Sequence, residues 1–283
     1  MRVLSESRLQ RRFREVIFRE TGIKMPETKE HLIAARLRRR LIAGNFRDLD
    51  AYLAFLFEEG GLRDEWPDIL DLITTNKTDF FREAAHFDIL SQGILPAALR
   101  AARPGGTVRF RFWSAAASTG AEAYTAAMLL ADAAAADARL DWMILGTDIS
   151  PGVVDQAGRA VYSRKEVAPV PVEMRSRYLM SGRPGRGTAQ FRIVPELRRR
   201  VRFAEMNLID PPYPVASGLD VIFLRNVLIY FDPDQQARVI AEVVNHLKPG
   251  GHFFVGHSES MVVEDPRLDQ IAPAAFRRKD TDR

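Results

Sequence analysis

Polar residues stand at the ends of several segments that the sequence predicts as β-strands. They end or follow the runs 142–148, 201–205 and 219–224: Asp148, Asn207 (next to the apolar Leu208), Arg225 and Asn226. In an open parallel sheet the carboxyl ends of the strands face the ligand crevice, where a carboxylate can accept both hydroxyls of a ribose. The sequence therefore predicts a nucleoside site with Asp148 as ribose acceptor. The alternative role for Asp148 is a cap for a helix starting at Pro151, for which Ser150 is better placed.

The loop SAAASTG at 114–120 links the first strand, predicted over 107–113, to a helix predicted over 119–135. Small side chains let backbone N–H groups approach a ligand, and they also suit close packing of a strand against a helix. A dinucleotide fingerprint, G-x-G-x-x-G, requires more glycines than Gly120 alone. The loop therefore disfavours an NAD site.

Two further segments contain residues that could do chemistry. The segment NKTDFFR at 76–82 joins a helical part to a strand-rich part, and its composition alone is typical of a linker anchored by two phenylalanines. His257, in GHSES at 256–260, could be a base, but the sequence shows no acid partner, so we expect a structural or supporting role. The five histidines are scattered, and no metal site is predicted.

Basic side chains gather on one face of a helix predicted over residues 27–43. At 100° per residue they fall within an arc of about 100°: Lys29, Arg36, Arg39 and Arg40. A solvated face is the simplest explanation, but like charges at i, i+3 and i+4 repel one another, which favours an acidic partner. The basic end would also allow nucleic acid, although no basic strand with interleaved aromatics and no zinc-finger spacing supports that.

The chain divides into a helical part and a part in which strands and helices alternate. The pattern of the first 70 or so residues predicts helices, including one near 49–57 and one beginning near Trp66-Pro67. From about residue 107, strand and helix runs alternate, which is typical of βαβ units and a parallel sheet. Residues 160–200 interrupt this alternation and suggest a small antiparallel insertion. We expect an α/β protein with a helical domain over 1–75, a linker to about 88, and a sheet domain over 89–283.

Composition excludes several classes of protein. The chain has 283 residues, 46% of them apolar, and no cysteine, which excludes disulfide frameworks, thiolate metal sites and cysteine nucleophiles. No run approaches the roughly 18 apolar residues of a membrane span, and the N-terminus lacks an apolar signal core. We therefore expect a cytoplasmic protein without membrane insertion. Residues 1–47 carry 13 Lys/Arg against 5 Asp/Glu, so the basic charge lies at one end.

Six motifs occur in order along the chain: NKTDFFR at 76–82, WSAAASTGAEAYT at 113–125, GTDIS at 146–150, MNL at 206–208, RNVLIYFD at 225–232 and KPGGHFFVGHSES at 248–260. Together they resemble the chemotaxis receptor methyltransferases, the CheR family, over essentially the whole chain. The resemblance implies a Rossmann-like methyltransferase sheet, an N-terminal all-helical domain and a β-subdomain at 160–200.

The same resemblance implies an activity and a set of site residues. Such proteins transfer a methyl group from S-adenosylmethionine to glutamates on the helical cytoplasmic region of chemoreceptors, giving glutamyl methyl esters and S-adenosylhomocysteine. The basic helix would meet the receptor, and the β-subdomain docks a receptor C-terminal tail peptide in some members. By the resemblance, the cofactor site would contain Asn76, Thr78, Arg82, Glu122, Asp148, Asn207, Leu208, Arg225 and Asn226.

The chemistry requires positioning more than proton transfer. A glutamate with a pKa near 4.3 is already ionised at pH 7, so no general base is needed. The carboxylate oxygen, methyl carbon and sulfonium sulfur must lie in line. Our hypothesis is that Arg82 and Tyr230 steer the acceptor carboxylate.

Four alanines also replace other residues of the family pattern SAGCSTGEE-P-YS: Ala116 replaces a glycine, Ala117 a cysteine, Ala121 an acid and Ala123 a proline. A Cβ at Ala116 would narrow the site or demand a negative φ. A weakly active or inactive S-adenosylmethionine-binding scaffold is therefore the alternative function, and a nucleic-acid methyltransferase the third. We expect a monomer with no nucleic-acid partner.

Overall fold

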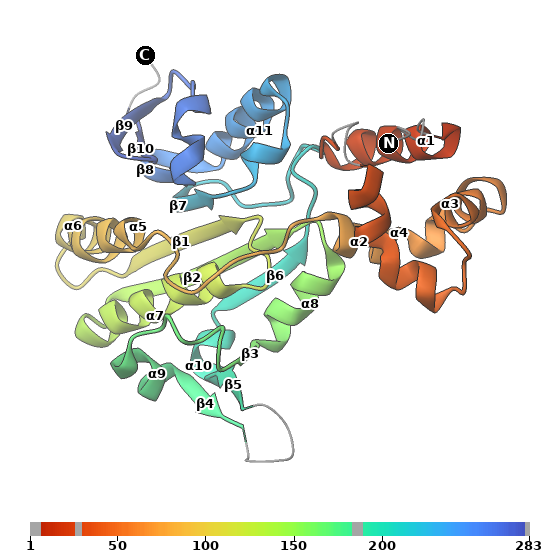
Figure 1. Ribbon diagram of the computed structural model, residues 1–283. Helices are drawn as coiled ribbons and strands as arrows, with labels where there is room; N and C mark the ends of the chain where they lie inside the picture. Colours follow the sequence, from red (N-terminus) through yellow and green to blue (C-terminus); the bar gives the residue numbers. More distant parts are fainter. Residues whose placement is uncertain (1–6, 26–29, 183–188, 281–283) are drawn as a thin grey trace.

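The computed structural model describes residues 7–25, 30–182 and 189–280. Its N-terminal part is a bundle of four helices: α1 (Arg8–Thr21), α2 (Glu30–Ala43), α3 (Leu49–Glu58) and α4 (Leu62–Ile73). Their apolar faces enclose a small core that includes Phe13, Leu37, Leu53 and Ile69. Figure 1 shows the bundle beside the sheet, at the end where α2 and α4 meet α8 and the loop that follows β6. The predicted all-helical domain is confirmed.

Helix α4 begins earlier than the sequence predicted. It starts at Leu62 rather than near Trp66, so Pro67 lies inside the helix instead of in its first turn. Proline there removes one backbone donor. Asp64 and Glu65 lie in the first turn, where the helix dipole favours negative charge, and this favours the earlier start.

The central sheet has seven strands in the order β6-β2-β1-β7-β8-β10-β9. The first five are parallel neighbours: β6 (Val201–Glu205), β2 (Leu140–Asp148), β1 (Val108–Ala115), β7 (Leu219–Leu224) and β8 (Leu247–Val255). The α/β prediction is confirmed. An antiparallel pair at one edge was not predicted: β10 (Ala275–Arg278) pairs with β8, and β9 (Leu268–Ala272) pairs with β10.

Helices cover both faces of the sheet, as the alternation of core residues along β1 shows. Phe110 and Phe112 share a core with α7 (Ala121–Ala136), while Trp113 and Ala115 share another with α11 (Pro233–Asn245). The first core also holds α5 (Ala84–Asp88), η1 (Ile89–Ile94) and α6 (Leu95–Ala101). Two 3-10 turns, η2 (Leu228–Tyr230) and η3 (His257–Val262), follow β7 and β8.

The chain order along the sheet reverses between β1 and β7. From β1 it continues to β2 and β6 on one side, whereas β7 and β8 lie on the other. In open α/β sheets the ligand crevice lies outside the carboxyl ends of the strands at such a point. Helix α8 (Pro151–Arg159) starts at this edge, three residues after the last residue of β2.

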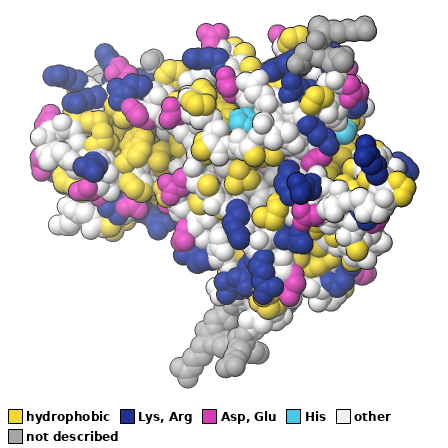
Figure 2. Space-filling view, turned by 180° about the vertical axis from the view of Figure 1, so that it is seen from behind, with side chains coloured by type: hydrophobic (Ala, Val, Ile, Leu, Met, Phe, Trp, Pro, Cys, Tyr) yellow, Lys and Arg dark blue, Asp and Glu magenta, His cyan; other side chains and the backbone are white. Residues whose placement is uncertain are grey.

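The segment 160–200 forms a small antiparallel sheet in the order β3-β5-β4, as predicted. Its elements are β3 (Val161–Ser163), α9 (Val172–Tyr178), β4 (Leu179–Ser181), β5 (Gln190–Ile193) and α10 (Pro195–Arg198). Tyr162 anchors it to the main core, packing on Phe80 with 4.9 Å between ring centroids. Figure 2 shows many Lys and Arg side chains on the surface around this small subdomain. Within the described residues, no helix is both long enough and apolar enough to cross a bilayer.

Candidate functional site

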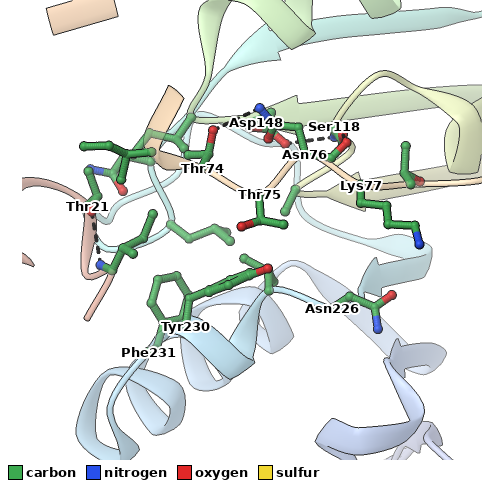
Figure 3. Close-up of a pocket in the computed structure, with 18 of the residues that line it drawn as sticks. Thr21, Thr74, Thr75, Asn76, Lys77, Ser118, Asp148, Asn226, Tyr230 and Phe231 are labelled. Atoms are coloured by element: carbon green, nitrogen blue, oxygen red, sulfur yellow. Dashed lines mark hydrogen bonds between the residues drawn. The ribbon is translucent and has the colours of Figure 1, made fainter. Parts of the chain in front are cut away.

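A cavity of about 350 Å³ lies between the helical domain and the carboxyl edge of the sheet. The structure brings to it all nine residues expected in the cofactor site, together with Tyr230: Asn76, Thr78, Arg82, Glu122, Asp148, Asn207, Leu208, Arg225 and Asn226. Figure 3 shows Asp148, Ser118 and Asn76 on one wall, and Tyr230 and Phe231 reaching in from the other. These residues come from five separate segments of the chain, which meet because parallel strands end at one edge.

Asp148 is buried, with 7% of its surface exposed, and its carboxylate is held by backbone N–H groups. Oδ2 accepts the N–H of Ser118 at 2.8 Å, and Oδ1 accepts the N–H of Ser150 at 3.1 Å. Burial raises the pKa of Asp148 above its ordinary value, and these N–H groups oppose that rise. Asp148 therefore presents a desolvated, fixed acceptor to the cavity.

Ser150 is the N-cap residue of helix α8, as the sequence predicted, but its side chain does not make the capping hydrogen bond. Its hydroxyl donates instead to Asp71 of helix α4. Asp71 Oδ1 also accepts the N–H of Gly152 at 3.0 Å, so a carboxylate of the helical domain caps α8.

Arg225 forms a buried ion-pair cluster at the end of β7, with 1% of its side chain exposed. Its Nη1 lies 3.1 Å from Glu122 Oε2, and its Nη2 lies 3.1 Å from Glu83 Oε2. Nη2 also donates to the carbonyl of Arg82 at 2.5 Å, and the Ser114 hydroxyl donates to Glu122 Oε1 at 2.6 Å. Both terminal nitrogens of the guanidinium thus face acceptors of the protein, whereas its buried Nε has no hydrogen-bond partner among the described residues.

The pKa values of the two carboxylates in this cluster move in opposite directions. Burial raises the pKa of Glu122, and the Arg225 charge opposes that rise without cancelling it. Burial also acts to raise the pKa of Glu83, but Arg225 together with the hydrogen bond from Asn226 and the nearby His257 holds that pKa below the ordinary value. Glu83 is therefore the firmly ionised partner of Arg225.

The segment 76–82 combines the anchoring and the functional roles considered for it. Phe80 is buried, and the N–H of Phe81 donates to the Thr125 hydroxyl at 3.1 Å. The carbonyl of Asn76 accepts the Ser118 hydroxyl at 2.9 Å, which ties this segment to the loop after β1. Arg82 Nη1 donates to the carbonyl of Lys77 at 3.1 Å, so the Arg82 guanidinium makes a backbone contact beside the cavity.

Residues of the helical domain form a wall that the sequence did not predict. The wall includes Thr21, Lys24, Met25 and Ile33. The N–H of Lys24 donates to the carbonyl of Tyr230 at 3.2 Å, which joins the two domains beside the cavity. No motif marks these residues, because their place in the site depends only on how the helical domain packs on the sheet.

The basic side chains predicted to share one face of α2 lie in different surroundings. Arg36 lines the cavity, and its Nη2 donates to the Thr75 hydroxyl at 3.0 Å. Arg40 pairs with Glu65 and with Asp68, the latter at 3.1 Å, so its acidic partners lie within this chain. Arg39 is exposed and does not line the cavity. Lys29 lies outside the described residues.

Ala116 lines the cavity with φ of +60°, so, of the two expected consequences of its Cβ, a narrowed site or a negative φ, the negative φ is wrong. Ser118 and Gly120 follow with φ of +51° and +84°. The left-handed region disfavours residues with a Cβ. The loop thus keeps a glycine-like path although it has alanine at 116.

His257 lies near the ion-pair cluster, with its Nε2 4.0 Å from Glu83 Oε2. Within the described part of the chain, Glu83, His86 and His257 hold potential metal-ligand atoms within 4.8 Å of one another. The same Glu83 oxygen pairs with Arg225, so the cation that faces it here is the guanidinium. Burial lowers the pKa of His86 to about 4, which leaves that ring neutral at pH 7.

Comparison with known proteins identifies the family to which these two domains belong. Residues 8–74 match the family model for the CheR methyltransferase all-alpha domain, and residues 76–275 match that for the CheR methyltransferase SAM binding domain. Chemotaxis protein methyltransferase 2 of Pseudomonas aeruginosa is 38% identical, over 88% of this chain and 85% of that protein. The chemotaxis protein methyltransferase of Salmonella typhimurium is also 38% identical, over 88% of this chain and 83% of that protein.

Solved structures give more distant matches. A glycopeptide N-methyltransferase complexed with sinefungin is 15% identical over 63% of this chain and 54% of its own, with a TM-score of 0.34. The two family models together span most of the chain, and the curated relatives exceed 30% identity over most of its length. The chain therefore belongs to the CheR family of chemotaxis protein methyltransferases, enzymes that use S-adenosylmethionine.

Proposed function

We propose that this enzyme transfers the methyl group of S-adenosylmethionine to glutamate side chains in the cytoplasmic helical region of chemoreceptors. The products are γ-glutamyl methyl esters and S-adenosylhomocysteine. The observation that carries the proposal is the composition of one cavity. Asp148 at the end of β2 and Glu122 at the start of α7 line it from the sheet domain, and Arg36 and Arg82 line it from the helical domain and the linker. A cationic cofactor and an anionic acceptor could therefore meet there.

The residues on the sheet side suit S-adenosylmethionine. Asp148 would accept the ribose hydroxyls, because it is the buried acceptor at the end of the second strand. Glu122 would attract the amino group of the methionyl portion of the cofactor. Its pairing with Arg225 offsets only part of the free-energy cost of burying the Glu122 charge, so a second cation would be favourable there. Asn76, Thr78, Asn207, Leu208 and Asn226 complete the proposed contacts. When bound, the cofactor supplies a methyl group on a sulfonium sulfur.

Arg82 and Tyr230 are the proposed steering groups for the acceptor. The bond to the Lys77 carbonyl uses only one of the five N–H donors of the Arg82 guanidinium, so other donors can reach the acceptor carboxylate in the cavity. Tyr230 can offer one hydroxyl from the opposite wall (Figure 3). The acceptor carboxylate is already ionised at pH 7, so the protein's task is to align it and exclude water.

Attack neutralises a carboxylate and a sulfonium together. A strong field favouring either charge would therefore slow the step. Pairing Arg225 with Glu83 and Glu122 keeps its full charge away from the reacting atoms. Arg82, which is partly exposed to solvent, would therefore be the guanidinium that hydrogen-bonds the acceptor carboxylate, and its field there is weaker than that of a buried, unpaired Arg225.

The same proposal covers the partner and the organisation of the chain. Residues 1–75 would form the receptor-facing helical domain, with Lys29, Arg36, Arg39 and Arg40 on its basic helix, and residues 89–283 the methyltransferase domain. Arg36 and Arg39 are the stronger candidates for receptor contact, because Arg40 has its own acids. A receptor tail peptide would dock on the subdomain at 160–200. We propose a cytoplasmic monomer with no nucleic-acid partner.

The test is incubation with methyl-labelled S-adenosylmethionine and a chemoreceptor cytoplasmic fragment from the same genome. Alkali should release the label as methanol, and replacing the receptor glutamates by alanine should abolish labelling. Absence of transfer while calorimetry still detects cofactor binding would contradict the proposal and favour a binding scaffold. Tight, salt-sensitive binding to DNA or RNA would instead favour a nucleic-acid methyltransferase.

A further inference from the structure

The side chain of Glu259, in η3, is buried, with 1% of the residue's surface exposed. Its carboxylate contacts the backbone of two segments. Oε2 accepts the N–H groups of Asn226 and Gly256, each at 2.7 Å, and Oε1 accepts the N–H of Ile229 at 3.3 Å. A carboxylate that accepts several backbone N–H groups fixes the segments that donate them.

Two of these donors belong to the segment 225–230, which carries cavity residues on both sides of the anchoring points. Asn226 lines the cavity itself, and Ile229 directly precedes Tyr230. Asn226 also has φ of +60°. This left-handed conformation costs free energy for a residue with a Cβ and persists only where its surroundings hold it.

We propose that Glu259 is a positioning residue for the methyl-transfer site, whose carboxylate holds the segment 225–230 so that Asn226 and Tyr230 face the cavity. Its effect on catalysis rests on the proposed function, whereas its effect on the segment does not. Both carboxylate oxygens serve as acceptors, so the charged group has a role that an amide of the same shape cannot fill. A glutamine would turn an N–H donor toward a backbone N–H on one side.

The first test is amide hydrogen exchange in the enzyme without cofactor or receptor. In Glu259→Gln, peptides covering 225–231 should exchange about tenfold faster or more than in the wild type, because a buried charged hydrogen bond is lost. The calorimetric Kd for S-adenosylmethionine should rise about tenfold, and kcat toward a receptor fragment should fall more than KM changes, because Tyr230 is displaced. Since glutamine has the same size, a cavity would not explain these effects.

Asp265→Asn is the matched control. Asp265 is another internal carboxylate of the C-terminal region, with 6% of its side chain exposed, and it pairs with Arg267 rather than with the segment 225–230. Its variant should lower Tm, while exchange at 225–231 and the cofactor Kd stay within about twofold of wild type. Equal changes at 225–231 in both variants would overturn the proposal, because they would reflect general destabilisation.

Gly256→Ala tests the same contact if Glu259→Gln fails to fold. A Cβ at 256 would lie 2.7 Å from Glu259 Oε2 and 2.5 Å from Asn226 Nδ2, while the φ of −66° suits alanine. Gly256→Ala should therefore reproduce the faster exchange and the weaker cofactor binding. Wild-type exchange and Kd in either folded variant would overturn the positioning role. A wild-type enzyme that transfers no methyl group would contradict the proposed function alone, because exchange and cofactor binding need no receptor.

Discussion

Asp71 Oδ1 accepts the backbone N–H of Gly152 at 3.0 Å, so a residue of the helical domain caps a helix of the sheet domain. Helix α8 starts at Pro151, three residues after Asp148 in the chain. The domain contact therefore acts on the turn that carries the proposed ribose acceptor. A Cβ at Gly152 would meet Asp71 Oδ2 at 2.1 Å, so the contact also requires glycine at 152.

We predict that Asp71→Ala lowers the free energy of unfolding by about 1 kcal/mol, the usual cost of losing a helix cap. It should also raise the Kd for S-adenosylmethionine, because the turn after Asp148 loses its support. Urea unfolding and calorimetry measure the two effects. Asp68→Ala is the control on the same helix, since its pair with Arg40 is more than half exposed on the Asp68 side and contributes little. Equal effects from the two variants would refute the role of Asp71 as a cap.

Arg82→Lys and Tyr230→Phe should reduce methyl transfer more than cofactor binding. We expect kcat/KM for the receptor fragment to fall about 10- to 100-fold, because a misplaced acceptor loses in-line alignment. The calorimetric Kd for S-adenosylmethionine should change far less in Tyr230→Phe. If kcat/KM falls and the Kd rises by the same factor in both variants, the steering role is wrong and these residues serve cofactor binding.

Ala116→Gly should stabilise the protein by about 0.5–1 kcal/mol, because glycine adopts a positive φ without the penalty that alanine meets. The midpoint of urea unfolding should therefore shift upward. Ala117→Gly is the control in the same loop, since Ala117 is buried and not among the residues with positive φ. That variant should lower stability. An Ala116→Gly enzyme less stable than wild type would contradict the strained conformation.

Stability should depend on pH through Glu65. The hydrogen bond from Arg40 is the main reason that the pKa of Glu65 lies below its ordinary value of 4.5 in the folded protein. A depressed carboxyl pKa stabilises the fold at pH values above the ordinary pKa, and this contribution disappears as the pH falls through the folded value. The Tm difference between wild type and Glu65→Gln should therefore be largest near neutrality and shrink below pH 4.5. A difference that stays constant from pH 7 to pH 3 would exclude this linkage.

Much of the sheet domain was predictable because its signals are local. Alternating strand and helix runs predict a parallel sheet, and parallel strands bring Asp148, Asn207 and Arg225 to one edge. The antiparallel β9 and β10 were missed, since short edge strands carry a weaker pattern. The start of α4 was misplaced because a proline was read as a first-turn residue, whereas acidic residues before it set the start.

The sequence by itself determined the two-part organisation, the edge at which the site forms and the residues that motif resemblance assigns to it. Only the tertiary structure decided which groups are already paired. Arg40 pairs with Glu65, Arg225 pairs with Glu83 and Glu122, and Asp71 rather than the Ser150 side chain accepts the N–H of Gly152 at the start of α8. Such pairings join residues far apart in the chain, and their energies depend on distance and burial. The distance between two such groups and their burial cannot be derived from the spacing of residues along the sequence.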